Sequence, residues 1–114
     1  MTFDVVALCP AEPGPKALVA AILTAGAGYF AESDEERRLI RVRHADGRAL
    51  LTIEGSRLVQ VPGEAERLLD IAAAVPQWWV EGRAPDDDAE AESVARTFAE
   101  ALAIATGGRT WTSR

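Results

Sequence analysis

His44 is the only histidine in the chain and therefore its only side chain that ordinarily titrates near neutral pH. A pair of histidines for acid–base chemistry, or a multi-histidine metal site, cannot be assembled from one chain. His44 alternates with Ile40 and Val42, which predicts a core-facing position near the end of a strand. We interpret it as a structural residue, with a ligand contact or a pH-sensitive role as the alternative.

Cys9 is the only cysteine, which excludes an internal disulfide and a cysteine-rich zinc site. A nucleophilic cysteine needs a base or a positive charge that holds it as a thiolate. A helix predicted a few residues later could bring its positive end close, but no feature of the sequence brings His44 to Cys9. We therefore favour a buried structural thiol.

Asp86, Asp87 and Asp88, with Glu90 and Glu92 beyond them, form the densest acidic cluster. Magnesium and calcium need oxygen ligands that converge, whereas consecutive residues at the start of a helix point in different directions. The spacing also differs from that of an EF-hand loop. We interpret the aspartates as a helix cap, and we predict neither a metal site nor a cofactor.

Arg41 and Arg43 share one face of a predicted strand. Guanidinium groups bind carboxylates in a bidentate manner, so these two residues are candidate contacts for an acidic peptide or a carboxylate ligand. The alternative, which we favour, is a solvated face balanced by Glu54 and other acidic residues. Arg48 and Arg57 lie in the same region of the chain.

Trp78 and Trp79 are adjacent in a short predicted strand. Neighbouring side chains of a strand point to opposite faces, so only one of them can face a core on one side of a sheet. The other must contact a helix, solvent or a partner. Because tryptophan is enriched at interaction hot spots, both are candidate binding residues, and Trp111 could join the same surface.

The elements that would position these side chains begin with a strand over 3–8 and a helix over 15–25. A short strand over 29–32 and a charged turn over 33–37 follow. The segment 38–62 then predicts an antiparallel meander. Its strands cover Ile40 to His44, Ala49 to Ile53 and Leu58 to Val61, with turns at Asp46-Gly47 and at Glu54 to Ser56.

The second half of the chain alternates helices with short strands. Apolar periodicity predicts a helix over 64–75 that Pro76 ends, and a strand over 78–82 follows. A second amphipathic helix begins after Pro85 to Asp88 and ends at Gly107-Gly108. A last strand covers 109–112.

The predicted order β-α-β-β-β-β-α-β-α-β indicates an α+β fold. We expect a mainly antiparallel sheet that contains the central meander, with about three helices packed on one of its faces. The length of 114 residues and the hydrophobic content of 48% fit a single domain over 1–114.

Charge and hydropathy restrict the partners. The formal net charge is −6, which disfavours nucleic-acid binding. The longest apolar run, 17–23, is far shorter than the roughly 20 residues that cross a bilayer, so no membrane contact is expected. The first residues lack the features of an export signal, and we expect a cytoplasmic protein.

These observations favour a small interaction or accessory module, of a regulatory or immunity type, without catalytic activity. Its partner would be another protein or a second copy of itself, as a heterocomplex or a homodimer. The alternative is a small-molecule-binding domain or a cofactor-independent enzyme with a pocket near Cys9 and His44. The composition and the order of elements resemble those of many small bacterial proteins, without a specific motif behind the resemblance.

Overall fold

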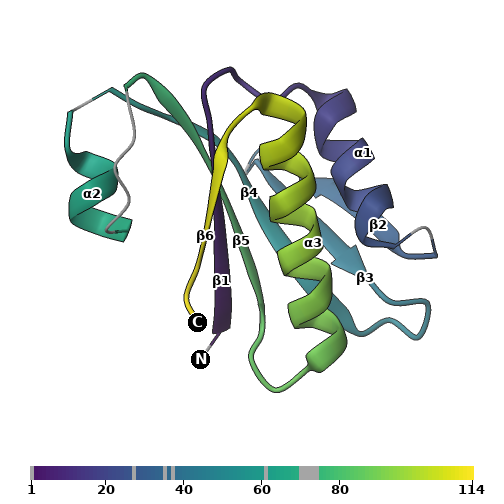
Figure 1. Ribbon diagram of the computed structural model, residues 1–114. Helices are drawn as coiled ribbons and strands as arrows, with labels where there is room; N and C mark the ends of the chain where they lie inside the picture. The colour runs from purple at the N-terminus through teal and green to yellow at the C-terminus, as the bar shows by residue number, and fades with distance from the viewer. Residues whose placement is uncertain (1, 27, 35, 37, 61, 70–74) are drawn as a thin grey trace.

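A computed structural model describes residues 2–26, 28–34, 36, 38–60, 62–69 and 75–114 (Figure 1). The elements in chain order are β1 (Thr2–Cys9), α1 (Pro15–Ala25), β2 (Phe30–Asp34), β3 (Leu39–Arg43), β4 (Ala49–Val59), α2 (Glu64–Leu69), β5 (Gln77–Pro85), α3 (Ala89–Thr106) and β6 (Arg109–Thr112). The predicted helix over 64–75 begins where expected, and residues 70–74 lie outside the described part of the chain.

The strands form one sheet in the order β2-β3-β4-β5-β1-β6, and all neighbouring strands are antiparallel. The α+β class is therefore confirmed, with a meander that runs through β2, β3, β4 and β5. β1 pairs with β5 on one side and with β6 on the other. Within the described residues, β2 and β6 are the edge strands of the sheet.

One predicted turn is wrong. Glu54 to Ser56 do not reverse the chain but lie inside β4, which is a single strand of 11 residues. The pairing register with β5 shifts by one residue between Glu54 and Arg57, so one extra residue of β4 forms a bulge. β4 continues past the bulge because both flanking segments are anchored by burial. Ile53 before the bulge is buried in the main core, and Val59 after it is buried in the smaller core.

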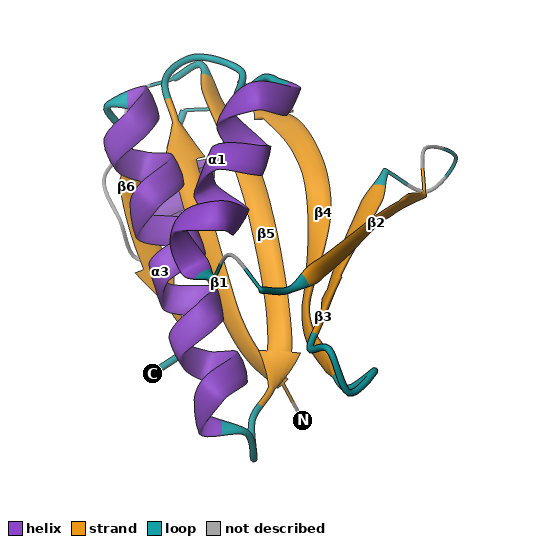
Figure 2. Cartoon of the chain, turned by 90° about the vertical axis from the view of Figure 1, so that its right-hand side faces the viewer, coloured by secondary structure: helices purple, strands orange, loops and turns teal. Residues whose placement is uncertain are grey.

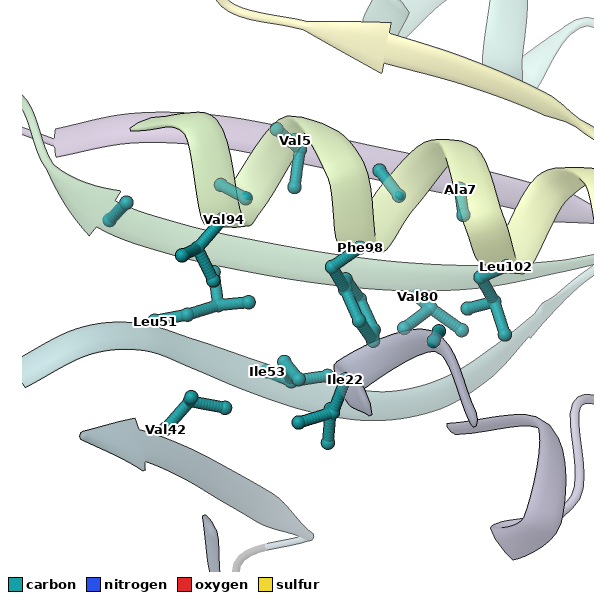
Figure 3. Packing of buried hydrophobic residues seen from close by; sticks show 14 of the residues in the cluster. Val5, Ala7, Ile22, Val42, Leu51, Ile53, Val80, Val94, Phe98 and Leu102 are labelled. Atoms are coloured by element: carbon teal, nitrogen blue, oxygen red, sulfur yellow. The ribbon is translucent and has the colours of Figure 1, made fainter. Parts of the chain in front are cut away.

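α1 and α3 cover one face of the sheet (Figure 2). Val94, Phe98 and Leu102 of α3 project onto this face among side chains of the sheet such as Val5 and Val80 (Figure 3). These positions recur at helical spacing on α3 and at alternate positions on the strands, as two packed layers require. The main core therefore lies between the two helices and the sheet.

The other face of the sheet has a smaller core near β1, β5 and β6. Leu69 of α2 packs there with Val6, Leu8, Val59 and Trp79. The expectation that all helices pack on one face is therefore wrong, because α2 contributes to the opposite face. Val6 and Leu8 are apolar as well as Val5 and Ala7, so β1 is buried on both sides and needs a cover on each.

The ends of α3 follow the prediction. The Asp88 carboxylate accepts hydrogen bonds from the backbone N–H groups of Glu90 and Ala91, both 3.1 Å long. Gly107 ends the helix in the left-handed conformation, with φ of 73°. Among the described residues, no helix is long and apolar enough to cross a membrane.

Candidate functional site

β2 is the most exposed strand of the sheet. It pairs with β3 from Phe30 opposite Arg43 to Asp34 opposite Leu39, and Figure 2 shows it at the outer margin, beyond the cover of the helices. Residues 30–33 are exposed, and Phe30 retains 62% of its accessible surface. In the described part of the chain, residues 30–33 make no backbone hydrogen bond outside the β2–β3 ladder.

The two sides of β2 differ in chemistry. Ala31 lies opposite Val42, a core residue beneath α1 and α3, so small side chains occupy the helix side of the strand. The other side carries Phe30, Glu32 and Asp34. An exposed aromatic ring and two carboxylates therefore follow one another along the outermost strand, on the sheet face that α1 and α3 leave uncovered.

Arg41 and Arg43 lie on that same uncovered face, one strand further in. Arg41 is the register partner of Glu32, and Arg43 is the register partner of Phe30. Arg43 Nη1 donates to the carbonyl of Gly47 over 3.4 Å. The predicted sharing of one face is confirmed, and acidic side chains interleave with the two arginines, so that they do not form a uniform basic patch.

A pocket of about 290 Å³ lies at the C-terminal end of β2, between α1 and the ends of β2 and β3. Ser33 contributes to it from β2 and Ile40 from β3, and Leu18 contributes from α1. Glu12 and Asp34 also line it. The pocket thus combines apolar walls with carboxylates, directly beside the open edge of the strand.

The two tryptophans of β5 point to opposite faces, as predicted. Trp79 is 7% exposed and belongs to the small core beside α2. The Arg57 guanidinium lies 5.0 Å from the centre of the Trp79 ring. The indole Nε1–H of Trp79 donates to Glu81 over 3.4 Å. Trp79 is thus a structural residue of the fold, and the structure gives it no free surface for a partner.

Trp78 packs against the margin of the main core and stays partly exposed. It faces Leu58 across β4 and β5 and lines a shallow groove next to the β4 bulge. Trp111 packs beside Trp79 on the other face. The structure therefore does not bring Trp78 and Trp79 together with Arg41 and Arg43 into one site.

A polar network joins the β3–β4 hairpin to the start of α3; we call it the hairpin clasp and define it as Tyr29, His44, Arg48, Asp88 and Glu90. Arg48 donates to Asp88 over 2.5 Å and to Glu90 over 2.6 Å. The Tyr29 hydroxyl donates to Glu90 over 2.7 Å. His44 Nε2 lies 3.9 Å from Glu90. The network crosses between elements far apart in the sequence and fastens them.

The ionisation of the hairpin clasp follows from these contacts. The Tyr29 hydroxyl and the Arg48 guanidinium lower the pKa of Glu90. The Ala91 N–H, together with Arg48, lowers the pKa of Asp88. The hydrogen bond to Glu90 raises the pKa of Tyr29. The contacts therefore keep Asp88 and Glu90 charged and keep the Tyr29 hydroxyl protonated as a hydrogen-bond donor, so the hairpin clasp acts as a structural fastening at neutral pH.

Gly26 makes room for this network. A Cβ atom at position 26 would lie 2.2 Å from the Tyr29 ring, so only glycine allows the ring to lie against the backbone there. The His44 position differs from its prediction, because its side chain is 34% exposed and lies 3.3 Å from Asp46 instead of facing the core. β3 ends at Arg43, whereas the predicted strand ends at His44.

Cys9 is fully buried, and desolvation raises the pKa of its thiol. The Cys9 side chain forms a hydrogen bond with the Thr106 side chain at the C-terminal end of α3. His44, in contrast, faces Glu90 at the N-terminal end of that helix. Sixteen residues of helix separate these contacts by roughly 24 Å. One pocket cannot contain both Cys9 and His44 in this arrangement.

Of the three aspartates before α3, Asp88 serves both the helix cap and the hairpin clasp. Among the residues that the structure describes, no group of three or more potential metal ligands converges. The strand predicted over 29–32 exists as β2, but its continuation through Asp34 was predicted to be a charged turn, and its place at the exposed edge of the sheet was not predicted. The alternation of Phe30, Glu32 and Asp34 with Ala31 and Ser33 is the signal that could have identified an exposed edge strand.

Comparisons with protein-family models, with curated proteins and with solved structures find no match for this chain.

Proposed function

We propose that the protein is a small interaction module that binds another protein along the edge strand β2, without catalytic activity. The observation that carries this proposal is the open outer edge of β2, with Phe30 at 62% exposure on it. The backbone N–H and C=O groups of an edge strand are available to an added strand, and an extended segment of a partner can pair with them.

Phe30 distinguishes this edge from one that is merely solvated. Natural edge strands avoid pairing by charges, prolines or bulges. Glu32 and Asp34 are charges of this kind, whereas Phe30 exposes an apolar ring at the start of the strand. Aromatic residues and arginine are enriched at the centres of protein interfaces. Phe30 beside Arg43 supplies both residue types within one cross-strand pair.

The test is affinity capture from a lysate of the source organism with three forms of the full chain. They are the unchanged protein, Phe30→Ser, and Ile104→Ser as a matched control. Ile104 is also an exposed apolar residue, at 83%, but it lies on α3 away from β2. Circular dichroism and thermal unfolding verify that each form is folded.

We expect one specific partner to be captured by the unchanged protein and by Ile104→Ser, and to be lost with Phe30→Ser. Equal capture by all three forms would contradict the location of the site. A chain that captures nothing specific, under conditions in which it is folded, would contradict the interaction function itself.

A further inference from the structure

β4 is longer than the strand that pairs with its outer side. β3 pairs with β4 only over residues 49–54, and the Gly55 N–H donates to the Arg38 carbonyl oxygen just beyond that ladder. β4 runs on to Val59 (Figure 2), and its last residues pair with β5 on the inner side. In the described part of the chain, no strand pairs with residues 56–59 on the side of β3.

A groove of about 710 Å³, which we call the β4 groove, lies along this unpaired stretch. Ser56, Arg57 and Leu58 line it from β4, and Arg38 lines it from the start of β3. Alternate residues of a strand direct their N–H and C=O groups to opposite sides, so part of the backbone of residues 56–59 faces the groove. We infer that an extended segment of another protein pairs with β4 here. The segment carries an acidic side chain on the Arg57 face and apolar side chains on the other.

Arg38 and Arg57 supply the positive charge of the β4 groove. Neither forms an ion pair or a side-chain hydrogen bond with a described residue. The Arg38 stem lies against the bulge, where a Cβ on Gly55 would come within 3.7 Å of Arg38 Cδ. The Arg57 guanidinium lies over the Trp79 ring, which leaves the N–H groups at its edge free to bind a carboxylate. Both guanidinium groups therefore have donors for an acidic side chain.

Three carboxylates near the β4 groove limit the negative charge that a partner can bring. Glu54 lines the groove, and its Oε1 lies 3.7 Å from Arg83 Nη2. Glu12 and Asp34 line the adjoining pocket, which also reaches Arg38, and Asp34 has an interaction partner of its own. The net charge of −6 also repels a strongly acidic segment. The β4 groove therefore fits a single acidic residue and not a run of them.

Apolar side chains lie on the other face of the added strand. Leu58 is 37% exposed, and its register partner Trp78 is partly exposed. Both also line a second groove of about 430 Å³, together with Val75 and Pro76. Arg57 and Leu58 are neighbours in a strand and point to opposite faces. A segment with an acidic residue on the Arg57 face therefore places its next side chains against Leu58 and Trp78.

The test selects a displayed library of random 12-residue peptides on the immobilised full chain. Enriched peptides are titrated against the unchanged protein and against the groove variant Arg38→Gln, Arg57→Gln. The matched control is Arg41→Gln, Arg67→Gln, which removes the same charge outside the β4 groove. Phe30→Ser identifies peptides that bind at β2 instead. Circular dichroism verifies that each form is folded.

We expect peptides in which one acidic residue lies among apolar ones, and whose binding does not depend on Phe30. Their dissociation constant should rise by about tenfold in the groove variant, because two exposed charge contacts are lost, and by less than about twofold in the control. N-methylation of the alternate peptide nitrogens that face β4 should abolish binding, because the added strand loses its N–H donors. N-methylation of the intervening nitrogens should leave binding intact.

Three results would overturn the inference. They are enriched peptides without an acidic bias, binding that the groove variant leaves unchanged, and equal effects of the two N-methylated series. Light scattering that shows a dimer of the unchanged chain and a monomer of the groove variant would place a second copy in the β4 groove and also overturn it. If all enriched peptides depend on Phe30, the β4 groove is excluded and the proposed function at β2 still stands.

Discussion

The Gly55 N–H donates a hydrogen bond of 2.7 Å to the carbonyl oxygen of Arg38, at the point where the ladder between β3 and β4 ends. Arg38 adopts a positive φ of 55° there. The contact fixes the start of β3 beside the bulge of β4. Because β3 carries β2, this close backbone approach helps to hold the edge strand in place.

Gly55→Ala should lower the free energy of unfolding. An added Cβ would lie 3.1 Å from Arg38 Cβ and 3.2 Å from the Arg38 carbonyl oxygen, so the Arg38 backbone would have to yield by a few tenths of an ångström at this close approach. We expect a loss of about 1–3 kcal/mol in urea denaturation. Gly28→Ala is the control, because nothing lies within 4 Å of a Cβ there; equal losses in both variants would contradict the packing described.

Trp79→Ala should destabilise the fold much more than Phe30→Ser. Trp79 is 7% exposed in the small core, whereas Phe30 is 62% exposed. Removing a buried tryptophan costs about 3–5 kcal/mol, and a change at an exposed strand position costs less than about 1 kcal/mol. Denaturation of both variants measures the difference, and a large loss for Phe30→Ser would show that its ring serves folding.

Arg48→Gln should weaken the hairpin clasp in a pH-dependent manner. The pKa values of Asp88 and Glu90 are lowered in the folded state, so their pairing with Arg48 stabilises the fold above their ordinary values of 3.8 and 4.5. This contribution is lost as the pH falls through the lowered values. The stability difference between the two proteins should shrink between about pH 5 and pH 3; a constant difference would contradict this role.

Cys9 should resist thiol reagents in the folded protein. Its side chain is fully buried, and burial raises the pKa of the thiol, so little thiolate is available. We expect labelling by a disulfide reagent to be slow in buffer and fast in denaturing urea. Rapid stoichiometric labelling of the native protein would show that the end of β1 is accessible.

Most of the fold could be predicted from alternation and periodicity. The strand over 109–112 and the helix over 15–25 match the structure at both ends. The turn at Glu54 to Ser56 was wrong because a polar segment with a glycine is typical both of a turn and of a bulge. The burial of Ile53 and Val59, which keeps β4 continuous, depends on tertiary packing.

The candidate site was less predictable. Alternation correctly placed Arg41 and Arg43 on one face, and correctly separated Trp78 from Trp79. Which tryptophan is covered depends on α2 packing against β1 and β5, a contact between distant segments. The importance of Phe30 depends on β2 being the outermost strand, and strand order cannot be deduced from local pattern.

The most direct test of the central claim is site-specific photocrosslinking in cells of the source organism. A benzophenone amino acid replaces Phe30 in one form of the full chain and Ile104 in another, and adducts are identified by mass spectrometry. We expect one discrete adduct with a separate protein from position 30 and none from position 104. An adduct with the mass of two chains, or no adduct from position 30, would contradict the binding of a partner protein along β2.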